Sequence, residues 1–563
     1  MKQFGTRLTF CLLFFPISVF SQVKNYPQGY FRNPLNIPMQ LVANFGELRA
    51  NHWHMGLDIR TMKRENLSVY AAADGYISKV KIEPGGFGRA IYINHPKGYT
   101  TLYAHLNNFS PALENYVKTE QYRLQSWAVE LNIPPALFPV AKGDFIAYSG
   151  NTGGSQGPHV HFEIRDTKTD DCLNPLLFGF PVADAVPPTI SRLAMYDRNL
   201  SVYAQSPKFL PVTKAGSGYT LASKVLKVSS NKISFAIGAT DRLSGSTNPN
   251  GIYSARILMD GVLASEFILD DINYNETRYL NAHIDYRLKI NGGSYVQHLS
   301  RMPGDTTTIY TPTANDGVLI FADSNIHDVR IETRDANQNL SVLSFSVQYV
   351  PAVTSVIRTS NNVMAPHSIN VYESPSFELS TSEYAIYDTV PIVYNETNAV
   401  SAYAVSALHS FCSPAIPVHD SVQVLIKPNA PVGDIGKVII KNTSGTKTVV
   451  EKVKWQNGWM GAKFRQLGTF QAFIDNEPPT INAPPPLVNS LSRIVFVPKD
   501  NFKTIKSFRA ELDGQWLRFT NDKGVSHIYK VDEKFTLGEH QLKVIIEDVA
   551  GNITIKEWTV RRG

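Results

Sequence analysis

The chain has 563 residues, too many for one hydrophobic core, and its length predicts about three to four domains. Its residues are 43% hydrophobic, 18% charged and 11% aromatic, a composition that is typical of a globular protein and favours β-structure over helical bundles. The formal net charge of +6 is spread along the chain without a dense basic stripe, which argues against a nucleic-acid-binding protein.

The N-terminus has the pattern of a secretory signal peptide. Lys2 and Arg7 precede the apolar run Leu8–Phe20, which is too short to span a bilayer. The alternative is a buried N-terminal strand or helix. We expect residues 1–21 to be removed and the mature protein to be exported through the Sec pathway, without a membrane span. It would then act in the periplasm, at the cell surface or outside the cell.

Two cysteines remain after that cleavage, Cys172 and Cys412. Two cysteines so far apart form neither a disulfide framework nor a thiolate zinc site. Whether they pair with each other is left open by the sequence.

Histidines concentrate in the N-terminal third, where six of the 14 lie between residues 52 and 161. This third alternates short β-like segments with glycine-containing turns. The expected strands are Leu67–Ala72, Gly75–Ile82, Ala90–Asn94, Thr100–His105 and Phe145–Tyr148. Any chemistry is therefore expected in this β-rich region, which we place at residues 22–182.

One segment in this region has helical rather than β-like spacing. Apolar residues recur at helical intervals between Ala112 and Asn132, and a proline pair follows at 134–135. We expect a helical insertion over residues 112–134. Its role is either that of a packing flap or a part in substrate choice.

The remainder of the chain is β-rich and partly repeated. A Pro-Pro-Thr-Ile sequence at 187–190 recurs at 478–481, and each copy is followed later by an Asp, a turn and an Asn before a final alternating strand. Residues 183–350 and 476–563 thus resemble bacterial immunoglobulin-like β-sandwich domains. Residues 351–475 also alternate in β fashion, with unclear boundaries.

Three short motifs carry the chemistry of the N-terminal third. They are a His-x-x-x-Asp at 54–58, a Tyr-Ala-His-Leu at 103–106 and a His-x-His at 159–161. On a strand, His159 and His161 point to the same side. Two histidines and one aspartate would leave zinc a fourth position for water, which is characteristic of catalytic sites. Each motif alone is weak, and a lone His-x-His is more often a half-buried strand pair.

All three motifs in this order resemble the lysostaphin/LytM-type zinc endopeptidases of bacterial cell walls. The resemblance covers Pro34–Pro175, about a quarter of the chain, and implies an antiparallel β-sheet peptidase domain. It implies that His54, Asp58 and His161 bind one Zn²⁺ per chain, and that His105 and His159 assist the reaction. Further matching segments are the Gly-Glu-Leu-Arg at 46–49, Ala-Ala-Asp-Gly at 72–75, Gly-Gly-Phe-Gly at 85–88, Lys-Gly-Asp at 142–144 and Ser-Gly-Asn-Thr-Gly at 149–153.

Three other residues are candidates for lining the groove or supporting an imidazole. His52 lies two residues before His54, but its spacing to Asp58 does not fit the family motif. Tyr103 belongs to the second motif. Glu163 falls on the same strand face as the paired histidines and is expected to bond an imidazole.

The resemblance implies hydrolysis of peptide bonds in the stem peptides or cross-bridges of peptidoglycan, which would be the partner of the protein. Protein partners are not predicted. The alternatives are an inactive wall-binding or regulatory module and an exported protease that acts on proteins.

The C-terminal β-domains contain only scattered histidines and are expected to be dispensable for the chemistry but not for targeting the substrate. In the rival arrangement, the first β-sandwich packs on the peptidase domain, and truncation near Ala183 would expose an apolar face.

Overall fold

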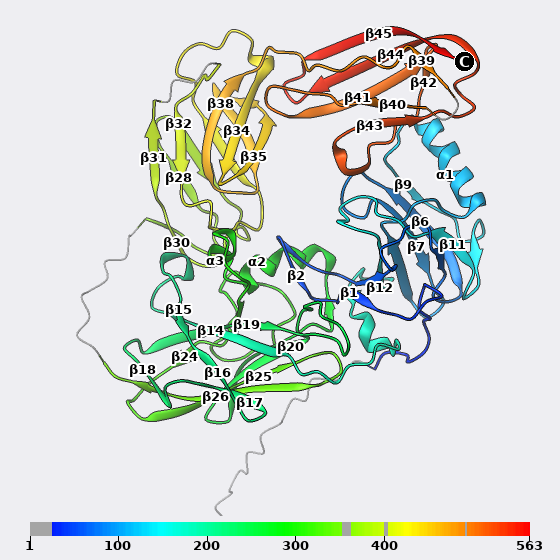
Figure 1. Ribbon diagram of the computed structural model, residues 1–563. Coiled ribbons are helices and arrows are strands. Elements are labelled where there is room, and N and C mark those ends of the chain that lie inside the picture. Colours follow the sequence, from blue (N-terminus) through cyan, green and yellow to red (C-terminus); the bar gives the residue numbers. More distant parts are fainter. Residues whose placement is uncertain (1–24, 352–361, 399–402, 490–491) are drawn as a thin grey trace, which may run out of the picture.

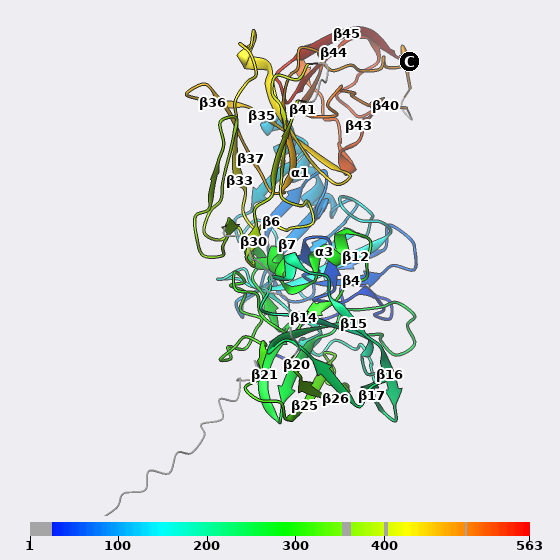
Figure 2. The same ribbon diagram turned by 90° about the vertical axis from the view of Figure 1, so that its left-hand side faces the viewer.

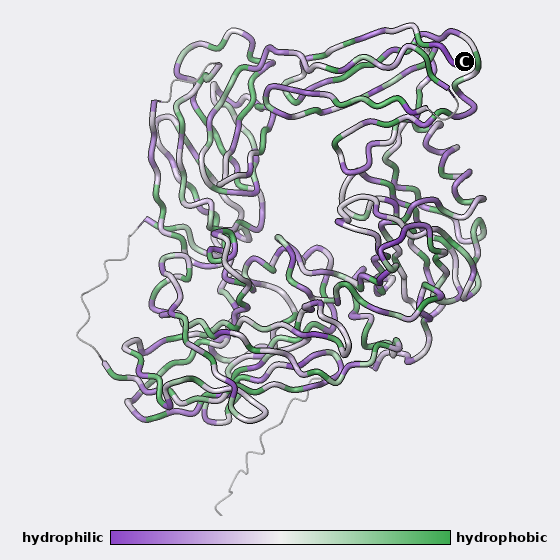
Figure 3. The backbone as a smooth tube through the Cα atoms, in the orientation of Figure 1, coloured by the Kyte–Doolittle hydropathy of each residue, from purple (hydrophilic) through white to green (hydrophobic). Residues whose placement is uncertain are grey.

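The computed structural model describes residues 25–351, 362–398, 403–489 and 492–563, so the predicted signal peptide lies outside the described residues. As predicted, the chain is mainly β. Its four parts follow one another around a ring, and the last part lies against the first (Figures 1 and 2). Hydrophobic residues are distributed over all four parts (Figure 3). Among the described residues, no helix has the length and apolar character needed to cross a membrane.

The first part is built on an antiparallel sheet with the order β1-β4-β12-β8-β7-β6-β10. Its strands are β1 (Leu41–Ala43), β4 (Leu57–Arg60), β6 (Gly75–Ile82), β7 (Arg89–Asn94), β8 (Tyr99–Ala104), β10 (Pro139–Val140) and β12 (His159–Asp166). Smaller strand pairs are β2 (Leu48–Arg49) with β3 (His52–Trp53), and β5 (Ser68–Tyr70) with β11 (Phe145–Tyr148).

Side chains on one face of the central strands form the core of this part. Ile59 on β4, Tyr103 on β8 and both Val160 and Phe162 on β12 are fully buried in one hydrophobic cluster. Because side chains alternate along a strand, the residues between them point to the opposite face. That opposite face of β12 carries His159, His161, Glu163 and Arg165.

The helical insertion is shorter than expected. Helix α1 covers Pro111–Leu124 and ends where Gln125 adopts a left-handed conformation, with φ of 50°. Val129–Asn132 then forms strand β9, which pairs with β6 and buries Val129 and Leu131. The spacing of the apolar residues in this stretch fits both the helical and the strand period. Pairing with β6 stabilises the strand conformation of residues 129–132.

The second part packs two sheets around a second hydrophobic cluster. One sheet contains β14 (Thr189–Asp197), β15 (Lys208–Leu210), β19 (Lys232–Thr240), β23 (Gln297–His298) and β24 (Leu319–Ile320). The other contains β16 (Val212–Ala215), β17 (Gly218–Leu221), β18 (Val225–Val228), β20 (Ser254–Met259), β21 (Val262–Ile268), β25 (Ile326–Arg334) and β26 (Leu340–Tyr349). Two short helices, α2 (Leu280–His283) and α3 (Tyr286–Ile290), connect strands of this part.

The third and fourth parts are also pairs of sheets. The third has β28 (Val371–Glu373), β29 (Phe377–Ser380), β33 (Val422–Ile426), β36 (Lys454–Gln456) and β37 (Trp459–Phe464) opposite β31 (Tyr394–Thr397), β32 (Leu408–Phe411), β34 (Val438–Ser444), β35 (Lys447–Lys452) and β38 (Gly468–Ile474). A short pair, β27 (Val363–Met364) with β30 (Val390–Pro391), adjoins them. The fourth has β39 (Leu487–Val488), β41 (Ile505–Leu512), β42 (Gln515–Trp516), β44 (Gly538–Asp548) and β45 (Ile553–Arg562), with β40 (Arg493–Phe496) and β43 (His527–Lys530).

The hydrophobic core of the second part extends into the first part, as in the rival arrangement that the sequence left open. Phe45, Trp53, Met55 and Cys172 belong to the hydrophobic cluster of the second part rather than to that of the first. Strand β22 (Asp271–Ile272) of the second part pairs with β13 (Cys172–Leu173) and so extends the sheet of the first. The expected domain boundary near residue 182 therefore does not separate two independent cores.

The ring closes through contacts between the fourth part and the inserted segment of the first. The Lys118 amino group lies 2.7 Å from a carboxylate oxygen of Glu533. The rings of Tyr122 and Trp516 meet edge to face at 5.4 Å between centroids. The helical insertion thus forms part of an interface between the two ends of the described chain.

We predict that a fragment of residues 22–183 will aggregate, whereas a fragment of residues 22–350 will fold. The shorter fragment exposes the four apolar side chains that pack into the second part, Trp53 foremost, and loses the pairing of β13 with β22. Size-exclusion chromatography and circular dichroism of both fragments provide the measurement. A monomeric, folded 22–183 fragment would contradict a shared core.

Candidate metal centre

The pairing of three neighbouring strands assembles the site. On β12, His161 lies directly opposite Asp58 of β4 on one side and Ala104 of β8 on the other. His54 precedes β4 and His105 follows β8, so all three sequence motifs meet at one place. Both His161 and Asp58 belong to the face of the sheet opposite the main core.

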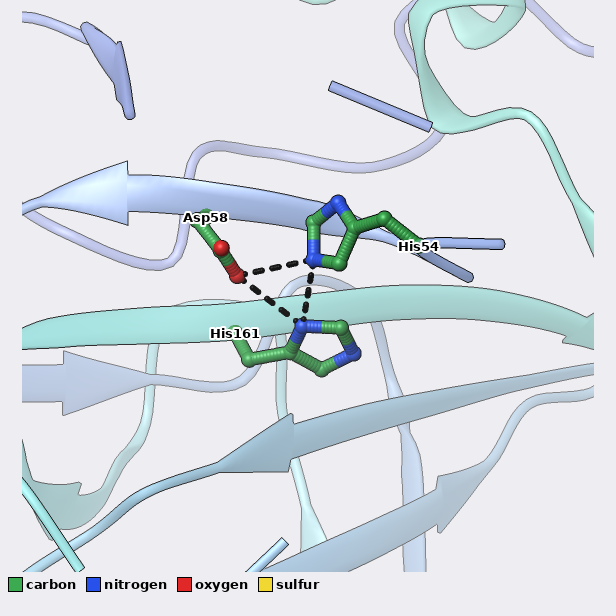
Figure 4. Close-up of side chains that lie close together, drawn as sticks. All are labelled: His54, Asp58 and His161. Atoms are coloured by element: carbon green, nitrogen blue, oxygen red, sulfur yellow. Dashed lines mark hydrogen bonds and ion pairs between the residues drawn. The ribbon is translucent and has the colours of Figure 1, made fainter. Parts of the chain in front are cut away.

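Three side chains converge to within hydrogen-bonding distance of one another (Figure 4). Nε2 of His54 lies 2.9 Å from Oδ1 of Asp58 and 3.0 Å from Nδ1 of His161. Nδ1 of His161 lies 3.0 Å from the same Asp58 oxygen. Each of the three residues is buried.

The outer hydrogen bonds of the two imidazoles fix which nitrogens face inward as acceptors. The Nδ1–H of His54 donates to the carbonyl oxygen of Asn44 at 2.7 Å. The Nε2–H of His161 donates to Oε1 of Glu163 at 2.8 Å. In the neutral rings, the facing nitrogens are therefore both lone pairs, and the nearby carboxylate adds a third acceptor.

Three acceptors so close together repel one another unless a proton or a cation lies among them. A tetrahedral zinc with these ligands would separate the donor atoms by about 3.3 Å, close to the distances found here. The partners of His54 and His161 are of the kind that orient histidine ligands in metal sites. The residues therefore fit a zinc ion with one further position.

The electrostatics of the group favour a positive charge at its centre. Burial opposes ionisation of His161, but hydrogen bonds to Asp58 and Glu163 outweigh it and raise the pKa to about 9. Burial also opposes ionisation of Asp58, yet the three surrounding histidines hold its pKa well below the ordinary range. Asp58 and Glu163 thus favour the protonated form of His161. A metal cation at the centre of the group would balance the same negative charge.

His105 and His159 lie beside this group with their rings 4.8 Å apart between centroids. The Nδ1–H of His105 donates to the carbonyl oxygen of Thr152, and that of His159 to the carbonyl oxygen of Gly157, both at 2.8 Å. Nε2 of each ring is then left as an acceptor. Nε2 of His159 lies 3.3 Å from Oδ1 of Asp58.

Burial and the neighbouring His161 and His159 lower the pKa of His105 to about 3. His105 itself has a left-handed backbone conformation, with φ of 60°, which is uncommon for a residue other than glycine. This conformation turns the chain at the end of β8 and brings the ring to the site.

Two glycines permit the close backbone approaches around these histidines. A Cβ atom at Gly56, between His54 and Asp58, would overlap the carbonyl oxygen of Phe162 on β12. A Cβ atom at Gly153 would overlap the main chain of Gly88, and its φ of +66° also favours glycine. The sequence motifs need glycine at both positions for this reason.

A chain of polar contacts extends along one face of β12. Glu163, which accepts the hydrogen bond from His161, also accepts one from Nε of Arg165 at 2.7 Å. Burial opposes ionisation of Glu163, but Arg165 and His161 lower its pKa to about 2. Cys172 is buried beside this carboxylate and is unpaired, as is Cys412.

Two candidates from the sequence do not lie in the site as expected. Tyr103 is fully buried in the core on the other face of β8, where its hydroxyl accepts from the amide of Ala72 and the hydroxyl of Thr101. The prediction that it lines the groove or supports an imidazole is wrong, because strand alternation turns it away from His105. His52 is exposed and lies outside the convergent group, bonded to the carbonyl oxygen of Ala50.

Several residues near the site were missed by sequence reasoning. Nη2 of Arg49 lies 3.2 Å from Oδ2 of Asp58. Asn44 contributes only its carbonyl oxygen, so its residue type carries no signal. Tyr274 of the second part stacks under the guanidinium of Arg165, 4.7 Å from the ring centroid.

The fourth part also reaches the loop that precedes β12. Oδ1 of Asp522 accepts from the amide of Gly153 at 2.8 Å, and Nζ of Lys523 donates to the carbonyl oxygen of Ser155 at 2.6 Å. The same loop includes Gly157, which orients His159. No local pattern relates these residues, because more than 360 positions separate them.

Parts of the chain are similar to known proteins and protein families. Residues 52–122 match the model of peptidase family M23, and residues 361–475 match that of the Zu5-like domain. An uncharacterised metalloprotease of Haemophilus influenzae is 31% identical over 160 residues, which cover 27% of this chain and 28% of the relative. The DD-carboxypeptidase/endopeptidase Mpg of Neisseria meningitidis serogroup B is 28% identical over 165 residues, 29% of this chain and 32% of the relative.

Among solved structures, the catalytic domain of lysostaphin from Staphylococcus simulans is similar at 22% identity and a TM-score of 0.17, over 24% of this chain and 87% of that domain. The chain thus spans about a third or less of the length of the two relatives named above. The first part of the chain therefore contains a peptidase family M23 domain, matched over residues 52–122, which include the first two of the three histidine motifs.

Proposed function

We propose that this protein is an exported, zinc-dependent endopeptidase that hydrolyses peptide bonds in peptidoglycan. The observation that carries the proposal is the convergence of two imidazole nitrogens and one carboxylate oxygen, with their outer hydrogen bonds directing the acceptors inward. Its similarity to the endopeptidase Mpg supports a cell-wall substrate.

His54, Asp58 and His161 would hold the zinc ion. Bound at this position, zinc supplies Lewis acidity, which acidifies a water molecule and polarises a carbonyl group. Asp58 would contribute the negative charge. Glu163 would strengthen Nδ1 of His161 as a metal ligand, because it accepts the hydrogen bond from the Nε2–H of the same ring. Arg49 screens part of the Asp58 charge from the other side.

His105 and His159 would handle protons and hold the developing oxyanion. Their Nε2 atoms are acceptors in the neutral rings, because each Nδ1–H is bonded to a carbonyl oxygen. A neutral imidazole beside the site can take a proton from the attacking water and return it to the leaving amine. Once protonated, it can donate a hydrogen bond to the oxyanion.

Completeness of this set favours an active enzyme over an inactive binding module. All five proposed residues are present, and their partners orient them for these roles. A protease acting on proteins would use the same chemistry, so the choice of substrate has to be tested directly.

We expect the mature protein to bind one zinc ion and to release peptides from purified sacculi but not from casein. His161→Ala and Asp58→Ala should lose both the metal and the activity, because two remaining ligands hold catalytic zinc poorly. Metal analysis by mass spectrometry and chromatography of the released peptides measure the two properties.

The matched control is His52→Ala, which removes an exposed histidine outside the convergent group and should retain zinc and activity. Full zinc occupancy in the His161 and Asp58 variants would refute the ligand assignment. Cleavage of casein in preference to sacculi would refute the proposed substrate.

Substitution of the assisting histidines should reduce turnover without reducing metal binding. His105→Ala and His159→Ala should keep the zinc yet lose about two to four orders of magnitude in kcat/KM, the range for a general acid or base. A soluble cross-linked muropeptide is the substrate for this measurement. Loss of metal in proportion to activity would identify that histidine as a ligand instead.

Contacts from the fourth part should support the loop that orients His159. Replacing both Asp522 and Lys523 by alanine removes two charge-assisted hydrogen bonds to this loop and should lower kcat/KM by about tenfold without loss of zinc. Lys506→Ala, in an exposed ion pair of the same part, serves as the control. Unchanged or increased turnover would show that the loop needs no such support.

A further inference from the structure

Two groups of three aspartates lie at corresponding places in the second and fourth parts of the chain. Each group takes one residue before the Pro-Pro-Thr-Ile sequence, one from a middle segment and one from the Asp-turn-Asn sequence before the last strand. Within each group, one carboxylate oxygen of every residue lies within 4.8 Å of the others. The groups are Asp184, Asp241 and Asp335, and Asp475, Asp500 and Asp548.

The first group is held together by the asparagine of the turn. The side-chain amide of Asn339 donates to Oδ2 of Asp335 at 2.7 Å and to the carbonyl oxygen of Asp184 at 3.3 Å. The amide nitrogen of Asn339 donates to Oδ1 of Asp335 at 2.8 Å. This turn therefore fixes two of the three carboxylate-bearing segments relative to each other.

The second group repeats this arrangement contact for contact. The side-chain amide of Asn552 donates to Oδ2 of Asp548 at 2.8 Å and to the carbonyl oxygen of Asp475 at 2.9 Å. The amide nitrogen of Asn552 donates to Oδ1 of Asp548 at 2.8 Å. The same geometry, built twice from similar sequence, indicates a shared structural role.

Asp241 gives the first group a feature that hydrogen bonds within the cluster do not explain. Its side chain is only 2% exposed, and among the described residues its Oδ1 accepts no hydrogen bond. Burial and the charges of Asp335 and Asp184 raise its pKa to about 7. Asn250, which is bridged to Asp241 through the main chain, also has a buried side-chain amide without a partner.

The carboxylates of both groups lack a directly paired basic side chain among the described residues. Among the described residues, none of the six aspartates forms an ion pair with lysine, arginine or histidine. A buried carboxylate with an unpartnered oxygen, next to two further carboxylates, is costly unless a cation neutralises it. The groups offer oxygen ligands only, which excludes the nitrogen and sulfur ligands that zinc prefers.

We propose that each group binds one Ca²⁺ ion. Calcium takes oxygen ligands at about 2.3–2.6 Å, so that oxygens on opposite sides of one ion lie about 5 Å apart, in line with the observed spacing. Carboxylates, a few carbonyl or amide oxygens and water supply such a coordination sphere.

Both sites lie where the chain enters a β-sandwich-like part of the ring. Asp184 is in the segment that leads from the first part into the second, and Asp475 is in the segment that leads from the third into the fourth. An ion that joins these segments to the body of the following part would stiffen two junctions of the ring.

The two sites differ in their surroundings. Beside the second group, the amino groups of Lys437 and Lys452 donate to the carbonyl oxygens of Gly551 and Ala550. These positive charges partly offset the carboxylates there, so the second site is the weaker of the two.

Calorimetric titration of CaCl₂ into the zinc-loaded, full-length mature protein tests the proposal. The wild type should bind two Ca²⁺ ions per chain and gain thermal stability on binding. Asp241→Asn should lose the tighter ion, Asp500→Asn the weaker one, and the double variant both. Asp328→Asn, an exposed aspartate of the second part, is the control and should bind two.

Absence of Ca²⁺ binding by the folded wild type at about 1 mM, an extracellular range for such sites, would overturn the proposal. An unchanged stoichiometry in both Asp241→Asn and Asp500→Asn would overturn it equally. If Asp241→Asn does not fold, Asp335→Asn replaces it, with the same expected loss of one ion. An equal loss in the Asp328 variant would show that binding is not localised to the groups.

Discussion

The antiparallel pairing of β4 with β12 is the constraint on which the metal centre depends. It places Asp58 directly opposite His161, and the turn before β4 then brings His54 to both. A shift of this register by one residue would send His161 into the apolar core and Val160 into the site. The burial of Val160 and Phe162 against Leu57 and Ile59 opposes such a shift, so the hydrophobic core and the candidate metal ligands specify one register.

The outer partners of the ligands come from progressively more distant parts of the chain. Glu163 is two residues from His161 on the same strand, and Asn44 is ten residues from His54. The carbonyl groups that orient the assisting histidines belong to the loop before β12, which the fourth part contacts in turn. The contacts around the candidate site therefore extend from one sheet of the first part to the fourth part.

The second part contacts a residue that orients one of the candidate ligands. Asn44, whose carbonyl oxygen orients His54, also exchanges two hydrogen bonds with Gly251 of the second part, both at 2.8 Å. Gly251 directly follows Asn250, whose main chain pairs with that of Asp241. Asp241 belongs to the first group of aspartates. A cation bound there would steady a segment that is only a few contacts from the proposed zinc ligands.

Local patterns in the sequence were sufficient for the β-rich class, for the strand Gly75–Ile82 and for placing Glu163 on the same strand face as His159 and His161, because alternation along a strand determines which side chains share a face. They were insufficient for Tyr103, whose place in a functional motif concealed that it faces the core. They also misjudged the end of the helix near Leu124, where the apolar spacing fitted both a helix and the strand that β6 selects.

By itself, the sequence determined the residue types of the candidate metal centre, their spacing within each motif and the repeated Asp-turn-Asn sequence. Only the tertiary structure decided that Trp53 is buried in the second part, that Asp522 and Lys523 reach the loop before His159, and that each trio of aspartates converges. These contacts join positions tens to hundreds of residues apart. They depend on strand register and on the packing of one part against another, and neither is encoded in any short stretch of sequence.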